Sequence, residues 1–228
     1  MVGHRSDLLE TKNPQNSVEM IRMSSSHGKI SIYHITDMTN LPGILSAGGL
    51  LSDACMQKRS PTIIGLSHIK TRRLTQIKVV CCHERFVGEF VPFYYCPRSP
   101  MLYTINQGNT GKPSGCQTTV IHLVSTIGYA VNLGSEWAIS DGNAGSFHAN
   151  FYSDLSQLST LDWSAIHANQ WTRKTHEKSA EFLVADFFPW AGIIEIGCHD
   201  TMVALNVEKM LEGAAHKPVV NVRSAWYY

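Results

Sequence analysis

The pattern of apolar and polar positions predicts short strands and short helices in irregular alternation. Apolar runs of strand length, rich in β-branched and aromatic residues, occur at 30–36, 117–126, 181–188, 193–196 and 218–226. Two helices are predicted between capping residues and glycines, at 41–47 and 201–213. The sequence contains no internal repeat and no low-complexity segment. Irregular alternation favours an α+β or mixed α/β domain over a regular doubly wound sheet.

The stretch 178–190 combines a strand pattern with a carboxylate in an unusual place. Period two puts Glu181 on the same strand face as Leu183 and Phe187, and Pro189 ends the ladder. A charge on an apolar face is costly unless it is paired or meets a cationic ligand. Most glutamates are solvated, so this stretch alone favours a Glu181 that borders the strand in water.

Length and composition indicate one globular domain. The 228 residues are 43% hydrophobic and 16% charged, with a formal net charge of +1, which excludes a disordered or collagen-like chain. We predict a polar N-terminal arm at 1–28, with a short helix at 18–23, and a single domain at 29–228. No apolar run approaches the ~18 residues of a membrane-spanning helix, and the start lacks the apolar core of a signal peptide. A cytoplasmic protein without a membrane association is expected.

The six cysteines show neither a CxxC motif nor the spacing of a disulfide framework. In a chain of this size we expect them to be reduced, cytosolic and buried. The pairs Cys82-His83 and Cys198-His199 contain zinc-ligand residue types, but their spacing does not match a zinc site. We therefore predict no metal.

The near-neutral total charge hides a basic cluster at 58–85. This segment holds seven of the 19 Lys and Arg residues and one acidic residue, Glu84. Such a cluster suits phosphate groups, either of a cofactor or of a nucleic acid. The alternative is a solvated helix face at 69–77 with Ile69, Leu74 and Ile77 turned inward, and the two interpretations carry about equal weight.

Polar groups also gather where the first predicted strand ends. His34 and Thr36 lie at this end, ahead of Asn40, which is predicted to cap the helix at 41–47. Imidazole and hydroxyl groups can hydrogen-bond a ribose or an amide. Taken alone, a histidine satisfied within the sheet is the more probable interpretation.

The middle of the chain is rich in aromatic residues and turns. Residues 91–103 contain three prolines and three tyrosines, so we predict extended segments with fixed turns and no long helix. Residues 134–145 are predicted as turns, and the polar and aromatic connection that follows has the length of a functional loop. Tyrosines can stack on a base or a nicotinamide, although more often they pack in a core. Neither GxGxxG nor GxxxxGK[ST] occurs, so a Rossmann or P-loop site is not supported.

Six short segments, spread over roughly residues 30–190, form a shared signature. They are YHIT at 33–36, NLPGIL at 40–45 with GGLLSD at 48–53, HIKTRR at 68–73, VPFYY at 91–95 with PRSPML at 97–102, SDGNA at 140–144 and AEFLV at 180–184. In this order they resemble the DarT toxins, the DNA ADP-ribosyltransferases of DarT–DarG toxin–antitoxin pairs. Each segment is weak by itself, but six in the family's order are specific.

The resemblance implies an ADP-ribosyltransferase-like α+β fold, a split, mainly antiparallel sheet with flanking short helices and NAD in its cleft. It implies that Glu181 is the catalytic glutamate and that Arg72 is an active-site arginine that also contacts NAD. Further NAD contacts are expected from His34, Ile35, Thr36, Asn40, Gly43 and Leu50. We predict DNA contacts from Lys70, Arg73, Tyr94, His148 and Tyr152.

The resemblance also implies the substrate and the partner. The acceptor would be a base in a short single-stranded DNA motif, usually thymidine, with guanosine in one branch of the family. The partner would be a macrodomain antitoxin that removes the modification.

This chemistry fits the residues independently. Breaking the nicotinamide glycosidic bond develops an oxocarbenium ion, which a nearby carboxylate such as Glu181 stabilises. Nicotinamide is a good leaving group, so no general acid is needed. The acceptor nitrogen must lose a proton, and His148 or His34 is the conventional base, because a free arginine has too high a pKa. Arg72 would hold the NAD phosphates or orient the base.

Alternatives within the enzyme class are ADP-ribosylation of RNA or protein and simple NAD hydrolysis, which need the same NAD-binding residues. An alternative outside it is a nucleic-acid-binding module without catalysis, although the neutral overall charge argues mildly against tight non-specific binding.

Overall fold

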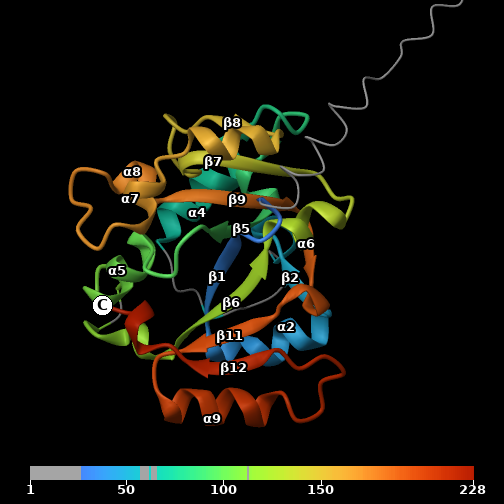
Figure 1. Cartoon of the computed structure of the whole chain (residues 1–228), viewed down its shortest axis with the longest axis vertical. Coiled ribbons are helices and arrows are strands. Elements are labelled where there is room, and N and C mark those ends of the chain that lie inside the picture. The colour runs from blue at the N-terminus through green and yellow to red at the C-terminus, as the bar shows by residue number, and fades with distance from the viewer. Residues whose placement is uncertain (1–26, 57–61, 63–65, 112) are drawn as a thin grey trace, which may run out of the picture.

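The computed structural model describes residues 27–56, 62, 66–111 and 113–228. Most of the arm predicted at 1–28, including its helix at 18–23, and Lys58 and Arg59 of the basic cluster lie outside the described residues. The described part of the chain is built around one eight-stranded sheet, with short helices along its faces and edges (Figure 1).

The sheet is mainly antiparallel, as predicted. Among its described strands only the first two neighbours run parallel. Its order is β12 (Val219–Val222), β11 (Glu195–Cys198), β6 (Val120–Thr126), β1 (Ser31–Asp37), β5 (Phe90–Tyr94), β9 (Ala180–Ala185), β7 (Trp137–Asn143) and β8 (Phe151–Tyr152). Two small ladders lie outside it: β2 (Gly49–Leu51) with β10 (Phe187–Pro189), and β3 (Lys78–Val79) with β4 (Arg85–Phe86).

The sheet is split between β1 and β5. These strands are paired at one register position, Tyr33 opposite Tyr94, whereas β1 pairs with β6 over its whole length. Figure 1 shows β1 and β6 running steeply through the middle of the molecule, and β9 and β7 nearly horizontal above them. The C-terminal half of β1 therefore diverges from the N-terminal half of β5, as the resemblance implied.

Strand β9 lies at the centre of one half-sheet, between β5 and β7, and all its residues are buried. Its alternation is clear, because Phe182 and Val184 pack in the main hydrophobic cluster and Leu183 in a second cluster. A strand buried on both faces reads as a continuous apolar run, which explains the sequence that follows Glu181.

The strand predicted to continue to Pro189 is interrupted. Asp186 has φ 59°, a left-handed conformation that a side chain disfavours, and β9 ends at the residue before it. Phe187 then starts β10, which pairs with β2 instead of continuing the large sheet. The prediction that Phe187 shares a strand face with Glu181 is therefore wrong.

Both predicted helices are present. Helix α2 (Leu41–Ala47) ends at Gly48, which has φ 75°, and α9 (Thr201–Met210) begins after Asp200, whose carboxylate accepts from the amide of Val203 at 3.0 Å. Asn40 occupies the predicted N-cap position of α2, but its side chain makes no cap hydrogen bond there. The helix predicted at 69–77 is α4 (Ser67–Thr75), and the buried Ile77 follows its end.

Two local predictions are wrong. The segment 91–103 was predicted to be extended, yet its last residues begin α5 (Pro100–Asn106), where the missing amide hydrogen of Pro100 costs nothing and Ser99 caps the helix. The segment 134–145 was predicted as turns, yet it contains β7, whose Gly142 lies under the ring of His176.

The remaining elements are short. They are the helices α3 (Asp53–Met56), α6 (Ile127–Asn132), α7 (Trp163–His167) and α8 (Thr175–Lys178), and the 3-10 segments η1 (Met38–Asn40), η2 (Val87–Glu89), η3 (Cys116–Thr119), η4 (Leu155–Thr160), η5 (Trp190–Gly192) and η6 (Ser224–Trp226). Within the described ranges, no helix is long and apolar enough to cross a membrane.

All six cysteines are described, and none forms a disulfide. Cys82, Cys96 and Cys198 are buried, as expected. The expectation of burial is wrong for the other three, because Cys55 is exposed and Cys81 and Cys116 are partly exposed.

Candidate active site

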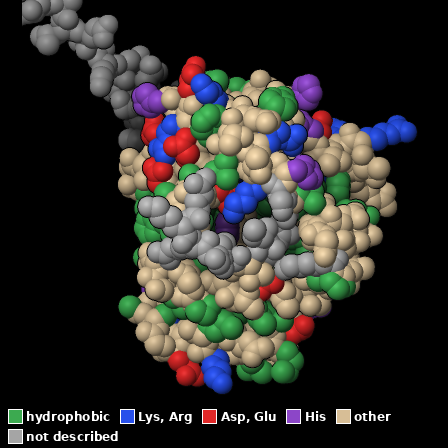
Figure 2. All heavy atoms as spheres, turned by 180° about the vertical axis from the view of Figure 1, so that it is seen from behind, with side chains coloured by type: hydrophobic (Ala, Val, Ile, Leu, Met, Phe, Trp, Pro, Cys, Tyr) green, Lys and Arg blue, Asp and Glu red, His purple; other side chains and the backbone are tan. Residues whose placement is uncertain are grey.

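A cavity of about 490 Å³ opens where β1 and β5 diverge. Figure 2 shows the molecule hollowed near the centre of this face, with a histidine inside the hollow and a basic side chain at its rim. The lining comes from both half-sheets, α2, β2 and α4: His34, Ile35, Thr36, Thr39, Asn40, Gly43, Ile44, Ala47, Gly49, Leu50, Leu51, Asp53, Met56, Thr62, Leu66, Ile69, Lys70, Arg73, Pro92, Met101 and Asn143. Apart from Arg72, all six residues that were predicted to contact NAD line this one cavity.

His34 bridges the split. Its Nδ1 lies 2.9 Å from the carbonyl oxygen of Pro92 on β5. A carbonyl can only accept, so Nδ1 carries the hydrogen and the neutral ring keeps Nε2 as an acceptor. Burial lowers the pKa of His34, and the positive charge of Arg73 adds to this effect. The histidine is thus fixed as a neutral imidazole at the cavity wall.

Asn40 stabilises the loop after β1. Its side-chain amide donates to the hydroxyl of Thr36 at 3.1 Å and to the carbonyl of Thr62 at 2.9 Å, and its oxygen accepts from the amide of Thr62 at 2.7 Å. Asn40 therefore links two segments that both line the cavity. At nearby Gly43 an added Cβ would meet no atom within 4 Å, so the α2 backbone is open to a ligand.

Helix α4 presents basic residues to the cavity at helical spacing. Ile69, Lys70 and Arg73 line it, which matches the i, i+1 and i+4 positions on one helix side. Lys70 forms an ion pair with Asp53 at 2.8 Å, and both side chains are about one-third exposed. This pair lies at the cavity edge, where solvent weakens it.

Glu181 is held by three hydrogen bonds. Nη1 of Arg73 donates to Oε1 at 3.1 Å and to Oε2 at 2.9 Å, and the backbone amide of Ala144 donates to Oε1 at 3.1 Å. Glu181 is only 1% exposed. The costly burial of this carboxylate is therefore offset by a cation and a backbone dipole. The alternative that Glu181 merely borders the strand in water is wrong.

Arg73 stands between Glu181 and the cavity. Burial disfavours its charged form, but the adjacent Glu181 carboxylate raises the pKa of Arg73 above its ordinary value, so the guanidinium stays charged. Its Nη2 is buried without a hydrogen-bond partner among the described residues. Arg73 lines the cavity whereas Glu181 does not, so the Arg73 side chain separates the carboxylate from the cavity.

Arg72 lies on a different side of α4. It does not line the cavity, and its guanidinium carbon sits 5.8 Å from the ring centre of Phe147, which is 67% exposed. His148, next to Phe147, is also exposed. The sequence offered no means to choose between two adjacent arginines, whereas the helix places Arg73 against Glu181 and Arg72 against the exposed loop.

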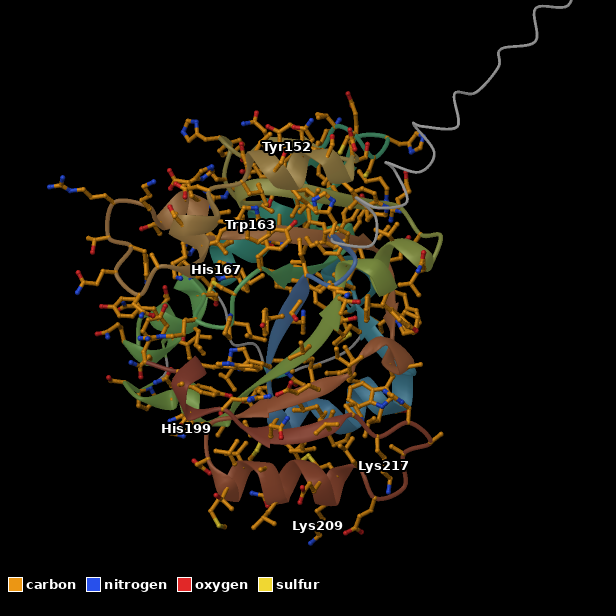
Figure 3. The ribbon with its side chains drawn as sticks, in the orientation of Figure 1. Tyr152, Trp163, His167, His199, Lys209 and Lys217 are labelled. Atoms are coloured by element: carbon orange, nitrogen blue, oxygen red, sulfur yellow. The ribbon has the colours of Figure 1, made fainter. Side chains whose placement is uncertain are left out.

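The other predicted DNA contacts are dispersed. Tyr94 pairs with Glu181 across β5 and β9, and burial followed by the Glu181 charge raises its pKa. Tyr152 is half-buried on the edge strand β8 and packs against the main core. Figure 3 shows Tyr152 at the upper end of the molecule and Trp163 below it. The indole of Trp163 donates to the carbonyl of Leu158 at 2.7 Å, so Trp163 serves packing.

Sequence reasoning missed three parts of the site. The amide of Ala144 and the side chain of Asn143 come from the end of β7, which was predicted as a turn. Ser140 was also missed, although its hydroxyl accepts from the Glu181 amide at 3.0 Å and fixes the start of β9. The segment SDGNA at 140–144 was the only available signal.

The cavity fits a dinucleotide that carries sugars and phosphates. Its volume lies in the range of small-molecule sites, its wall is mainly apolar, and its polar groups converge. The neutral His34 offers a hydrogen-bond acceptor. Arg73 Nη2 is buried and has no hydrogen-bond partner among the described residues. Across the described residues, no group of three or more His, Cys, Asp or Glu side chains is arranged to hold a metal.

A family model and curated relatives match this chain over most of its length. The model of the family described as ssDNA thymidine ADP-ribosyltransferase, DarT, matches residues 33–228. A DNA ADP-ribosyl transferase of Thermus aquaticus is 40% identical over 201 residues, covering 86% of this chain and 88% of the relative. One from Mycobacterium tuberculosis is 30% identical over 210 residues, covering 86% and 88%.

Solved structures agree with these matches. DarT from Thermus sp. 2.9 in complex with ADP-ribosylated ssDNA has a TM-score of 0.81 and 39% identity, covering 87% of this chain and 96% of that chain. The same protein in complex with NAD+ has a TM-score of 0.78 and 37% identity, covering 87% and 98%. The predicted fold, the predicted reaction class and NAD as the substrate are thereby confirmed. The chain belongs to the DarT family of single-stranded DNA thymidine ADP-ribosyltransferases.

Proposed function

We propose that this chain transfers ADP-ribose from NAD to the base of thymidine in single-stranded DNA, with Glu181 as the catalytic carboxylate and Arg73 as the active-site arginine. The observation that carries the proposal is the contact of the 1%-exposed Glu181 with Arg73 and the Ala144 amide beside the split of the sheet. A buried carboxylate held by fixed donors is pre-organised to face a developing positive charge.

Glu181 stabilises the cation that forms as nicotinamide leaves. The glycosidic bond breaks, its electrons depart with nicotinamide, and C1′ of the ribose becomes an oxocarbenium-like centre. A carboxylate close to this centre lowers the barrier because the site is dry and needs no reorganisation. Three hydrogen bonds from two donors, Arg73 Nη1 and the Ala144 amide, keep the Glu181 carboxylate from rotating freely, which fixes its direction relative to the ribose.

Arg73 acts as a positioning and charge-bearing group. Its raised pKa rules out proton acceptance at neutral pH. Nη1 holds Glu181, while the charged side chain lines the cavity and can attract a phosphate, a ribose oxygen or a carbonyl of the acceptor base. This assignment replaces Arg72, which contacts the exposed Phe147 loop instead.

The nicotinamide–ribose end of NAD binds along the β1 wall. His34 provides a neutral Nε2 acceptor and Asn40 orders the loop that follows. Of the two histidines predicted as bases only His34 lines the cavity, and its Nε2 is assigned to NAD binding. His148 lies on the exposed loop, where it is suited to contact with DNA.

The acceptor DNA approaches from the side of α4 that carries Arg72. Phe147 is an exposed aromatic beside this arginine, so a base can stack on the ring while a phosphate meets the guanidinium. In a duplex the pairing edge of thymine is hidden, so a single strand or a flipped base is required. Tyr152 and Trp163, which pack within the protein, have no part in this contact.

We also propose a macrodomain antitoxin as partner and the cytoplasm as compartment. A base carrying ADP-ribose cannot pair, so a cell that makes this enzyme needs an activity that removes the group. A solved structure of Thermosipho africanus DarTG in complex with ADP-ribose shares the fold at a TM-score of 0.69 and 21% identity, and this chain covers 51% of its length. The test is survival of cells that express this chain with and without a macrodomain hydrolase.

The substrate is tested by mass spectrometry of an oligonucleotide mixture incubated with NAD. A thymidine-containing single strand is expected to gain the mass of one ADP-ribose, and the same strand in a duplex, its RNA equivalent and a strand without thymidine are expected to remain unchanged. Labelling of guanosine, RNA or protein would overturn the acceptor assignment. Release of nicotinamide without any labelled acceptor would instead identify an NAD hydrolase.

A further inference from the structure

Two adjacent cysteines form a thiol pair outside the active-site cavity. Cys81 and Cys82 stand on the β3–β4 hairpin, and neither lines the cavity. Their Sγ atoms are 4.0 Å apart. Cys81 is partly exposed, whereas Cys82 is 2% exposed. A reagent can therefore reach one sulfur while the other is protected behind it.

The hairpin turn holds the two sulfurs together. His83 and Glu84 have φ angles of 51° and 54°, and the amide of Arg85 donates to the carbonyl of Cys82 at 3.1 Å. Two central residues with positive φ match a type I′ hairpin turn, which ordinary side chains disfavour. The conformation therefore has to be held by its surroundings.

A hydrogen bond from His83 and an ion pair from Arg85 fix this turn against the segment before β7. His83 Nδ1 lies 2.6 Å from Oε1 of Glu136, and Arg85 Nη1 lies 3.3 Å from Oε2 of the same residue. The residues on both sides of Glu84 are held by Glu136, which restrains the turn that carries the two thiols.

The two thiols differ in reactivity. The neighbouring Cys82 side chain lowers the pKa of Cys81 to about 7, and the Ser153 side chain adds to this effect, while burial and Glu136 oppose it. Contact with Cys81, then burial, raises the pKa of Cys82. The pair thus consists of a partly exposed thiolate and a buried thiol, which suits a nucleophile and a resolving group.

We propose that Cys81 and Cys82 form a reversible oxidation site for hydroperoxides that closes to a vicinal disulfide. In the first step the Cys81 thiolate attacks one peroxide oxygen, the O–O bond breaks, and Cys81 becomes a sulfenic acid as hydroxide or alkoxide leaves. In the second step the Cys82 sulfur attacks the sulfenic sulfur, the S–O bond breaks, water leaves, and the S–S bond forms. The peroxide is reduced by two electrons and the thiol pair is oxidised by two.

The two sulfurs lie close enough to close a disulfide, and the strained bond would reopen easily. The sulfurs must approach from 4.0 Å to the ~2.05 Å of a disulfide, a distance within reach of side-chain rotation. The Cα atoms of adjacent residues are about 3.8 Å apart, shorter than in most disulfides, so the bond is readily reduced. A second thiol at hand also protects Cys81 from further, irreversible oxidation.

The site lies directly behind the catalytic strand. Cys82 donates to the carbonyl of Trp137 on β7 at 3.3 Å, and it packs in the same hydrophobic cluster as Leu183 and Ala185 of β9. Closure of the disulfide removes the Cys82 thiol hydrogen that serves this carbonyl. We therefore expect oxidation to change the packing of β9, the strand that carries Glu181.

The test is peptide mapping after brief treatment of the reduced, full-length protein with hydrogen peroxide at pH 6. Trypsin releases 79–85 with both cysteines and 30–58 with Cys55, an exposed thiol that serves as internal control. A pKa of about 7 gives ~30 times more thiolate at pH 6 than an ordinary thiol, and the lower nucleophilicity of a weaker base reduces this to about six-fold. Peptide 79–85 is expected to lose two hydrogens about six-fold faster than Cys55 in peptide 30–58 is oxidised, and dithiothreitol should restore it.

Two variants separate the steps. In Cys82→Ser the Cys81 sulfenic acid should persist and be trapped by dimedone, whereas in Cys81→Ser the buried Cys82 should stay unmodified. The proposal is overturned if wild-type peptide 79–85 reacts no faster than peptide 30–58, or if Cys81 proceeds to sulfinic acid without a disulfide. The wild-type measurement alone decides the matter should either variant fail to fold.

Discussion

The two walls of the cavity hold their polar groups in opposite ways. On the β1 wall, His34 and Thr36 line the cavity directly, and Asn40 orders the loop beside them. On the β9 side, Glu181 is 1% exposed and lies behind Arg73, with both carboxylate oxygens hydrogen-bonded. The polar groups of the β1 wall are accessible to a ligand, whereas the charge of Glu181 on the β9 side is covered by Arg73.

This difference separates binding from catalysis. Uncharged groups such as imidazole and hydroxyl can face the cavity at little cost, because water or a ligand satisfies them. A carboxylate removed from water needs a partner, and breaking such a buried pair costs about 3–5 kcal/mol. Changes on the β1 wall should therefore weaken NAD binding, and changes at Glu181 or Arg73 should reduce the rate.

The largest effect is expected from Glu181→Gln. The amide keeps the shape of the side chain and can still accept from Arg73, but it lacks the charge that stabilises the oxocarbenium ion. Loss of one such electrostatic contact costs ~3–4 kcal/mol, so the single-turnover rate on a thymidine oligonucleotide should fall at least ~10²–10³-fold. Circular dichroism should confirm an intact fold. A folded Glu181→Gln protein with wild-type rate would remove Glu181 from the mechanism.

Next in size is the contrast between two adjacent arginines. Arg73→Gln should lower the rate ~10²-fold and lower Tm, because Glu181 loses its cation. Arg72→Gln should leave the rate at saturating DNA close to wild type and raise the KM for DNA, because Arg72 touches Phe147 and not Glu181. The measurement is a steady-state titration of oligonucleotide at saturating NAD.

Arg73→Lys controls for folding. Lysine keeps the positive charge but lacks the planar guanidinium and its second terminal nitrogen, so the fold should persist while the rate stays low. If Arg72→Gln and Arg73→Gln exchanged these effects, the roles proposed for the two residues would have to be exchanged as well.

A smaller effect is expected on the DNA side. Phe147→Ala removes an exposed aromatic contact worth ~1–3 kcal/mol, which corresponds to roughly 5- to 150-fold in the KM for DNA. The KM for NAD should not change. Tyr152→Phe is the matched control, since Tyr152 packs against the core and should leave both constants unchanged. Equal effects of the two substitutions on the KM for DNA would argue against the Phe147 side as the DNA approach.

The smallest effects are expected at the β1 wall. Loss of one hydrogen bond costs ~0.5–1.5 kcal/mol, so His34→Ala and Thr36→Ala should each weaken NAD binding about 2- to 10-fold in calorimetry. Burial lowers the pKa of His34 below that of a free imidazole, so the neutral ring predominates in the folded protein over pH 6.5–8. Wild-type NAD affinity should therefore be flat over this range and decline only under more acidic conditions. An affinity that changes steeply between pH 7 and 8 would speak against a neutral His34.

The sequence indicated the strands and capped helices where local pattern and tertiary packing agree. The runs at β1, β6 and β9 and the Gly48 and Asp200 boundaries were found in this way. The local pattern gave wrong predictions where a neighbouring residue or the backbone conformation changed the structure that the pattern predicts. Pro100 starts a helix because Ser99 caps it, and Asp186 breaks an apolar run because its backbone is left-handed.

The site was only partly predictable for a related reason. Motif resemblance selected Glu181 and the β1 residues, because these stand on segments with distinctive neighbours. It could not distinguish Arg72 from Arg73, since their separation by about 100° around α4 is visible only once the helix is docked against β9. The Ala144 amide was invisible for the same reason, because any residue supplies a backbone donor.

The central claim is that Glu181 and Arg73 act as one catalytic unit, and a double-mutant cycle tests it most directly. Single-turnover transfer to a thymidine oligonucleotide is measured for wild type, Glu181→Gln, Arg73→Gln and the double variant at saturating NAD. Groups that act together are non-additive, so the double variant should be no slower than the slower single variant, within about three-fold. Two independent losses that multiply in the double variant would contradict the claim.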